Sequence, residues 1–146
     1  MRFRCLRFSL GINKMEKTNK FIEAVGRRKE AIARVRITEA TKNSFVINGK
    51  PMAETIKVKE LEQVTTEPLN QEGVGKFSIT VVVRGGGIAS QAEAIRLGLA
   101  RALIDWKHEL RGAMKKAGFL KRDPRAKERR KFGLKKARKA PQWSKR

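Results

Sequence analysis

The chain has 146 residues, of which 36 are Lys or Arg and 14 are Asp or Glu, so its formal net charge at pH 7 is +22. A chain of this length favours one domain with appendages, and so large a positive charge favours a polyanionic partner, with nucleic acid as the first candidate. Cys5 is the only cysteine, which excludes an internal disulfide and a cysteine-rich metal site, and no apolar run is long enough to span a membrane.

Residues 1–14 contain three arginines, several large apolar residues and no acid. This composition suits an organellar transit peptide. Alternatively, Met15 opens a hydrophilic stretch just before the first strand-like segment, and residues 1–14 are then a dispensable extension or an incorrectly assigned start. We treat residues 1–14 as an N-terminal extension and expect the folded domain within residues 15–118.

Two strand patterns follow. Phe21–Val25 is short and apolar, Gly26–Lys29 (Gly-Arg-Arg-Lys) is predicted to be a basic turn, and Lys29–Ile37 alternates with a period of two. Its inward positions are Ala31, Ala33, Val35 and Ile37, and its outward positions are Ile32, Arg34 and Arg36. Arg34 and Arg36 could form an ordinary solvated sheet face, or they could join Arg27, Arg28 and Lys29 in a phosphate-contacting patch.

The next segment mixes short elements. Ser44–Gly49 is predicted to be a strand that ends in an Asn-Gly turn, a pair that accepts positive φ. Pro51 can begin a short helix over Met52–Ile56, and a second helix over Lys57–Val64 would direct Leu61 and Val64 to the core. Phe77–Arg84 alternates most plainly and completes four expected strands.

Two main helices are predicted after this last strand. The first runs from Ser90 to Asp105, with Ser90 and Glu93 spaced as a capping box. Its inward positions are Ile88, Ala92, Ile95, Leu99 and Leu103. The second covers Trp106–Ala117, with Leu110 and Met114 inward, and stops at Gly118. These patterns predict an α+β domain with a four-stranded mixed sheet packed by two main helices.

Gly85, Gly86 and Gly87 lie between the last strand and the first main helix, where phosphate-binding loops are found. No Lys-Ser or Lys-Thr follows them, and their spacing departs from the dinucleotide fingerprint. A tight turn, an RNA phosphate at the helix start and a free nucleotide are the three interpretations. His108 is the only histidine and has no cysteine or second histidine to pair with, so neither catalysis nor a metal or other cofactor is expected.

The C-terminal part holds most of the excess charge, because residues 107–146 contain 17 Lys or Arg and three acids. Residues 119–146 have no apolar period that could bury a face, so we expect an extended basic tail that needs an anionic partner. Phe132 and Trp143 interrupt the cations. Each ring could stack on a base while its neighbours neutralise phosphates, or it could pack on the parent domain.

Several motifs in chain order closely resemble bacterial-type small-subunit ribosomal protein nine. They are Gly26-Arg27-Arg28-Lys29 with Ala31–Val35, the Gly85–Gly87 turn with Gln91-Ala92 and Ala94-Ile95-Arg96, Lys116-Ala117-Gly118, Arg122-Asp123-Pro124-Arg125, Gly133–Arg138, Ala140-Pro141-Gln142 and the terminal Ser144-Lys145-Arg146. The resemblance spans about residues 21–146. This chain departs from the family pattern at Glu93, where small residues are frequent, and at Trp143 and Phe132, where phenylalanine and tyrosine are usual.

The resemblance implies a non-enzymatic constituent of the small ribosomal subunit, with a domain like the second domain of ribosomal protein five. It would sit in the subunit head, beside other head proteins and in no membrane, in the cytoplasm or, if residues 1–14 are a transit peptide, in an organelle. Ribosomal RNA would be bound by Arg27, Arg28, Lys29, Arg34, Arg36, Gly85, Gly86, Gly87, Gln91, Arg96, Arg122, Arg125, Arg129, Arg130, Lys131, Lys135, Lys136, Arg138 and Lys139. Peptidyl-site transfer RNA would be contacted by Trp143, Ser144, Lys145 and Arg146.

Two other functions fit the residues alone. A general nucleic-acid-binding protein acting off the ribosome would explain the charge equally well. A nucleotide or phosphate-ester enzyme could use Gly85–Gly87, but it would lack a visible general base or metal set.

Overall fold

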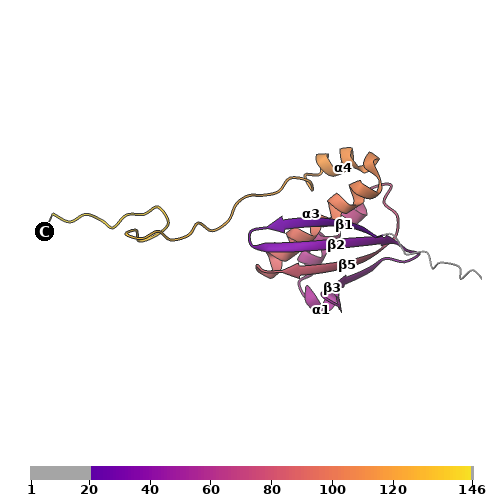
Figure 1. Cartoon of the computed structure of the whole chain (residues 1–146), viewed down its shortest axis with the longest axis horizontal. Helices are drawn as coiled ribbons and strands as arrows, with labels where there is room; N and C mark the ends of the chain where they lie inside the picture. The colour runs from indigo at the N-terminus through magenta and orange to yellow at the C-terminus, as the bar shows by residue number, and fades with distance from the viewer. Residues whose placement is uncertain (1–20, 146) are drawn as a thin grey trace, which may run out of the picture.

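The computed structural model describes residues 21–145, so the predictions for residues 1–20 and for Arg146 lie outside the described part. It is an α+β domain built on one mixed sheet (Figure 1). The strands are β1 (Ile22–Arg28), β2 (Ala31–Glu39), β3 (Ser44–Ile47), β4 (Lys50–Pro51) and β5 (Phe77–Arg84). The helices are α1 (Met52–Thr55), α2 (Lys59–Thr66), α3 (Ile88–Trp106) and α4 (Arg111–Lys116), with short 3₁₀ turns η1 (Glu67–Asn70) and η2 (His108–Leu110).

The five strands that residues 21–145 form lie in the order β1-β2-β5-β3-β4. β5 pairs antiparallel with β2 and parallel with β3, so a strand from later in the chain separates two earlier ones. The predicted α+β class and mixed sheet are confirmed, but the predicted count of four strands is wrong. The fifth strand, β4, has only two residues and therefore shows no alternation that a sequence pattern could reveal.

The predicted Asn-Gly turn connects β3 to β4. Asn48 and Gly49 have φ of 49° and 79°, the pair of positive values that a two-residue hairpin turn of this hand requires. The Asn48 side chain also extends the sheet, because its Oδ1 accepts a hydrogen bond from the Val83 backbone N–H (2.9 Å) and its Nδ2 donates to the Val83 carbonyl (3.2 Å). The turn residue thus joins β3 to the central strand.

The Gly26–Lys29 segment is mostly strand, which corrects its prediction as a turn. β1 continues through Arg28, and only Lys29, with φ of 50°, and Glu30 make the turn. Gly26 is needed for close packing instead. A Cβ there would overlap the Ala94 carbonyl of α3 and lie 2.5 Å from the Gly98 nitrogen. β1 and α3 therefore touch backbone to backbone, an approach that no larger residue permits.

The period-two patterns of β2 and β5 place the core as predicted. Their inward residues, Ala31, Ala33, Val35, Ile37, Phe77, Ile79, Val81 and Val83, are buried. They pack against the buried side of α3, including the predicted Ala92, Ile95, Leu99 and Leu103. Ile88 is exposed, contrary to the prediction, because α3 begins there and its first two residues lie outside the core.

The predicted capping box at the start of α3 is absent. The helix begins at Ile88 with Gly87 as its N-cap, and no side chain caps it. Ser90 lies inside the first turn and is buried, so its hydroxyl does not occupy the capping position.

The second main helix is shorter than predicted. Trp106 ends α3, and the ring packs edge-on against Phe77 with centroids 5.0 Å apart. η2 and α4 then cover the rest of the segment, with Leu110 and Met114 buried as predicted. Gly118 has φ of 78°, which confirms the predicted helix stop.

The helix predicted over Lys57–Val64 is α2, shifted two residues toward the C-terminus. Leu61 packs against the core as expected, whereas Val64 is only half-buried and Thr65 takes the buried position. The Thr65 hydroxyl is accommodated because it donates a hydrogen bond to the Leu61 carbonyl at 2.8 Å.

Phe119 and Leu120 pack against the core after α4. Residues 121–145 contain no helix or strand, and Figure 1 shows this segment leading away from the sheet. None of the helices formed by residues 21–145 has the length and apolar character needed to cross a membrane.

Candidate RNA-binding surface

The sheet face opposite the core carries alternating arginines and aliphatic side chains. The strand register places Arg34 opposite Val82 and Ile32 opposite Arg84. These four residues line an open hollow, and Ile32 and Val82 are each 46% exposed. Guanidinium groups bind phosphate oxygens, and exposed aliphatic side chains can contact sugars or bases. We call this hollow and its four residues the open sheet face.

Arg84 belongs to this surface although the sequence-based site omitted it. The sequence pattern could have identified it, because Arg84 occupies an outward position of the alternating strand β5. The sequence could not show that Arg84 lies across from Ile32, since their pairing joins segments about fifty residues apart.

Arg34 and Arg36 share one face, as predicted, and both bind Glu23. The Arg36 Nε lies 2.7 Å from one Glu23 oxygen, and the Arg34 Nε lies 3.2 Å from the other. The Arg36 guanidinium also lies over the Phe21 ring, 4.7 Å from its centroid. Each guanidinium has five N–H groups, and the Glu23 pairs use only Nε, so donors remain for a phosphate. Their role in RNA binding stays a prediction.

The glycine loop packs against the β1–β2 turn. Gly85 and Gly86 have φ of 71° and 70°, and a Cβ at Gly85 would lie 2.7 Å from the Glu30 carbonyl oxygen. Two of the three glycines are therefore required by the backbone, which supports the tight-turn interpretation. Gln91 donates from Nε2 to the Gly85 carbonyl (3.2 Å) and so holds the loop. Gly87 has open space around it, and RNA contact at this loop stays a prediction.

The tail is attached to the domain through Arg28, the last residue of β1. Its Nε lies 2.5 Å from a Glu93 carboxylate oxygen and its Nη2 lies 3.0 Å from Asp123 Oδ2. Its Nη1 donates to the backbone carbonyls of Asp123 (3.3 Å) and Arg125 (2.9 Å). We call Arg28, Glu93, Asp123 and Arg125 the tail clasp.

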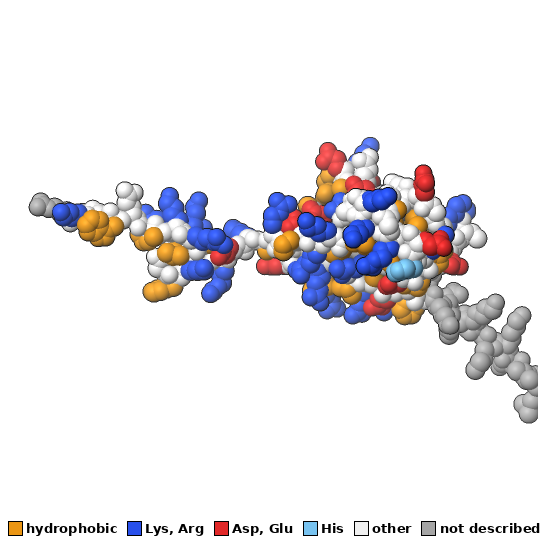
Figure 2. Space-filling view, turned by 90° about the horizontal axis from the view of Figure 1, so that it is seen from above, with side chains coloured by type: hydrophobic (Ala, Val, Ile, Leu, Met, Phe, Trp, Pro, Cys, Tyr) orange, Lys and Arg blue, Asp and Glu red, His pale blue; other side chains and the backbone are white. Residues whose placement is uncertain are grey.

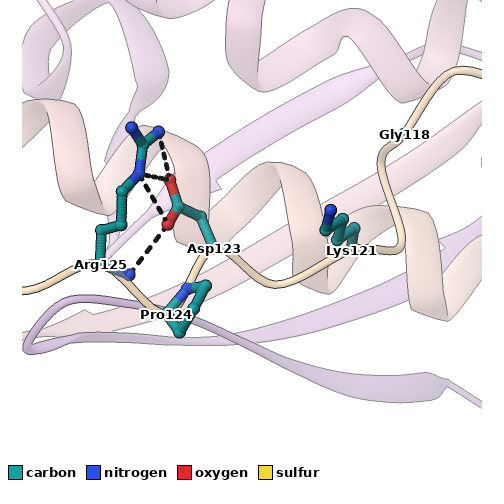
Figure 3. A pocket seen from close by; sticks show the side chains of 5 residues that line it. All are labelled: Gly118, Lys121, Asp123, Pro124 and Arg125. Atoms are coloured by element: carbon teal, nitrogen blue, oxygen red, sulfur yellow. Dashed lines mark hydrogen bonds and ion pairs between the residues drawn. The ribbon is translucent and has the colours of Figure 1, made fainter.

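Asp123 is the centre of the clasp on the tail side. Figure 3 shows its carboxylate facing the Arg125 side chain, beside a hollow that Gly118, Lys121 and Pro124 also line. Asp123 accepts hydrogen bonds from the Arg125 backbone N–H at 2.9 Å and from its Nη2 at 2.8 Å. The pKa of Asp123 is lowered well below its usual range, first by the side-chain hydrogen bond from Arg125 and then by the backbone N–H.

Arg96 also has partners within the domain. Its Nη1 lies 3.0 Å from a Glu67 oxygen, and its guanidinium lies over the Phe119 ring at 5.7 Å. The structure thus separates the cations predicted to bind ribosomal RNA. Arg28 and Arg96 hold elements of the protein together, whereas Arg27 and Lys29 are exposed at the β1–β2 turn.

Within the tail, an ion pair between Glu128 and Arg138 closes a loop of the chain. One Glu128 oxygen lies 2.8 Å from the Arg138 Nε, and the Lys135 N–H donates to the Lys139 carbonyl at 2.8 Å. Figure 2 shows Lys and Arg side chains along this segment. Phe132 is fully exposed and Trp143 is 80% exposed, so both rings are accessible to a partner. Lys145 is exposed too, and Arg146 lies outside the described residues.

An α+β domain with an open basic sheet face and a strongly cationic tail is typical of proteins that bind polyanions. Comparison with protein families gives the particular family. The family model described as "Ribosomal protein S9/S16" matches residues 26–146, and the chain belongs to this family of ribosomal proteins.

Curated relatives agree with this family. The chain is 51% identical over 126 residues to the small ribosomal subunit protein uS9 of Nocardia farcinica, covering 86% of this chain and 75% of that protein. It is 52% identical over 126 residues to the small ribosomal subunit protein uS9 of Mycobacterium tuberculosis, covering 86% and 83%.

Proposed function

We propose that this protein is a structural constituent of the small ribosomal subunit, acting in the ribosome and without catalysis of its own. Its open sheet face and its tail bind ribosomal RNA in the subunit head, beside other head proteins. The observation that carries the proposal is the family match over residues 26–146 together with the charge of the matched tail. Residues 121–146 contain 13 Lys or Arg and two acids.

The tail fits RNA better than it fits a protein partner. Its cations are distributed along the chain, and contacts to phosphates need charge and reach but no base specificity. Phe132 and Trp143 offer exposed rings, and stacking on a ring contributes about 1 to 3 kcal/mol per base. We propose that the tail is extended and passes between RNA segments, and that binding to this RNA orders it fully.

The ribosomal-RNA contacts can be tested by salt dependence. Each phosphate neutralised should add about 0.7 to 0.9 to the magnitude of the slope of log affinity against log salt. We expect Arg34→Ala and Arg84→Ala each to weaken binding of the head-domain ribosomal RNA and to reduce this slope. Lys59→Ala in α2 removes one charge away from the open sheet face and serves as the control. Unchanged slopes in both arginine variants would contradict the proposed role of the open sheet face.

The tip of the tail has a separate proposed partner. Trp143, Ser144, Lys145 and Arg146 would contact the transfer RNA in the peptidyl site, with Lys145 and Arg146 on its phosphates. Deleting residues 145–146 should leave incorporation into subunits intact but weaken retention of peptidyl-site transfer RNA, measured by filter binding to purified subunits. Wild-type retention by subunits that contain the truncated protein would refute the assignment.

A further inference from the structure

We infer that the tail clasp fixes the direction in which the tail leaves the domain, and that Arg28 is a positioning residue for RNA binding and not itself an RNA ligand. Arg28 joins three segments that are distant in the sequence: the end of β1, α3 and the base of the tail. This role differs from the phosphate contact that the Gly-Arg-Arg-Lys motif suggests. Its consequence for RNA affinity rests on the proposed function.

The clasp begins on rigid elements. Arg28 lies two residues beyond Gly26, where β1 and α3 touch backbone to backbone. Glu93 comes from the same helix and binds the Arg28 Nε. The Arg28 guanidinium is therefore held within the domain, by strand β1 and by Glu93 of α3, independently of its contacts to the tail.

On the tail side, Arg28 binds the main chain as well as a side chain. Its Nη1 donates to two carbonyls, those of Asp123 and Arg125, and its Nη2 pairs with the Asp123 carboxylate. Because the two carbonyls lie on either side of Pro124, these contacts fix the direction in which the chain runs as well as its position. The fixed φ of Pro124 restricts that path further.

The charges within the clasp balance, which argues against an RNA phosphate on Arg28. Arg28 and Arg125 face Glu93 and Asp123, so two cations meet two anions. Arg28 donates three hydrogen bonds to protein acceptors, its Nη2 pairs with the Asp123 carboxylate, and the side chain is only 12% exposed. A phosphate would have to displace carboxylates that the domain already places there. Arg27, the neighbour on the opposite face of β1, is exposed and suits a phosphate.

Fixing the start of the tail lowers the conformational entropy that RNA binding must remove. Leu120 is the last residue that packs on the core, so without the clasp the chain could pivot from Lys121 onward. With it, the tail cations begin from one defined point and direction. The clasp should thus raise RNA affinity without adding a phosphate contact.

The experiment measures a distance in the free, full-length protein. Cys5 is replaced by Ser, and spin labels are attached at Glu54→Cys in α1 and Lys127→Cys just beyond the clasp. We expect a narrow distance distribution in the otherwise wild-type protein and in the control Arg27→Ala, and a distinctly broader one in Arg28→Ala. Asp123→Ala, a change on the tail that leaves the core untouched, should also broaden it, by less than Arg28→Ala because both carbonyl acceptors remain, and it carries the test if Arg28→Ala fails to fold. Equal widths in all four proteins would overturn the inference.

A second readout separates positioning from phosphate binding. For head-domain ribosomal RNA, Arg28→Ala should lower affinity by about threefold to tenfold with an unchanged salt slope, because only ordering is lost. Arg27→Ala should reduce the slope by about 0.7 to 0.9. A slope reduction in Arg28→Ala like that in Arg27→Ala would assign Arg28 to a phosphate and refute its positioning role. If the wild type bound no ribosomal RNA, the proposed function would fail, while the distance measurement would still decide whether the clasp exists.

Discussion

At the scale of residues, Asp123 shows how a surface carboxylate becomes a structural group. It accepts hydrogen bonds from Arg125 and pairs with Arg28 on β1, so only its ionised form fits the clasp. Neutral Asp123 would lose both ion pairs. The clasp is accordingly sensitive to the protonation of one carboxyl group.

The lowered pKa of Asp123 fixes the direction of its pH dependence. A carboxyl group whose folded pKa lies below its unfolded value of about 3.9 contributes fully above that value, and the contribution is lost as pH falls toward the folded pKa. We expect the contribution of Asp123 to the clasp to be unchanged between pH 8 and pH 5. A carboxyl ¹³C NMR titration should place the Asp123 midpoint clearly below about 3.9. In Arg125→Ala the midpoint should rise, and an ordinary midpoint in the wild type would contradict this account.

The sequence could not reveal the different roles of Arg27 and Arg28. Both belong to one basic motif, and a period of two says only that they point to opposite faces. The partners of Arg28 lie 65 and 95 residues away, at Glu93 and Asp123. Those distances in sequence are bridged only by the packing of α3 on β1 and by the return of the chain after α4.

At the scale of elements, the contact between β1 and α3 depends on two glycines. Gly98 faces Gly26, and a Cβ at Gly98 would lie 2.8 Å from a Val35 methyl group. Neither β1 nor α3 therefore has a side chain at the point where they cross. The helix lies closer to the sheet than ordinary core packing would allow.

Gly26→Ala should destabilise the domain, because its Cβ meets backbone atoms that cannot rotate away. We expect a loss of about 1 to 3 kcal/mol or more in the free energy of unfolding, measured with urea. Gly112→Ala in α4 is the matched control, since a Cβ there meets nothing within 4 Å. It should stabilise by about 0.4 to 1 kcal/mol. Equal effects of the two substitutions would show that the crossing is not tight.

The elements that the sequence predicted best are those whose burial follows one simple period. β2 and β5 alternate, and their inward residues were identified correctly because each strand has one face on the core. β4 is too short to have a period. The prediction of the capping box was wrong because Ser90 is buried and Glu93 pairs with Arg28. The spacing of the two residues does not show either role.

At the scale of the whole molecule, the buried core and the basic tail are separate parts of the chain. Within residues 21–145, every buried core residue lies between Ala24 and Met114, whereas 13 of the 36 Lys and Arg residues lie in residues 121–146. The composition of residues 119–146 predicted an extended basic tail. It could not place the tail relative to the sheet, because that placement depends on the clasp.

Removing residues 121–146 should therefore leave the domain folded. We expect its unfolding free energy to change by less than about 1 kcal/mol, because the truncation removes no buried core residue and mostly exposed ion pairs, and because Arg28 keeps Glu93 as a partner. The salt slope for ribosomal RNA should fall by up to about 9 to 12, the value if all thirteen cations contact phosphates. Calorimetry and salt titration measure the two effects, and unfolding of the truncated domain would disprove the separation.

The position of β5 at the centre of the sheet has a consequence for folding. β1 and β2 can pair early as a local hairpin, but β2 and β3 cannot join one sheet until residues 77–84 insert between them. This insertion closes a loop of about forty residues, so it should limit the folding rate. Until then the free edge of β2 can pair with other chains. During synthesis, the period in which the edge of β2 can pair with other chains thus ends when β5 is in place, before the basic tail has been made.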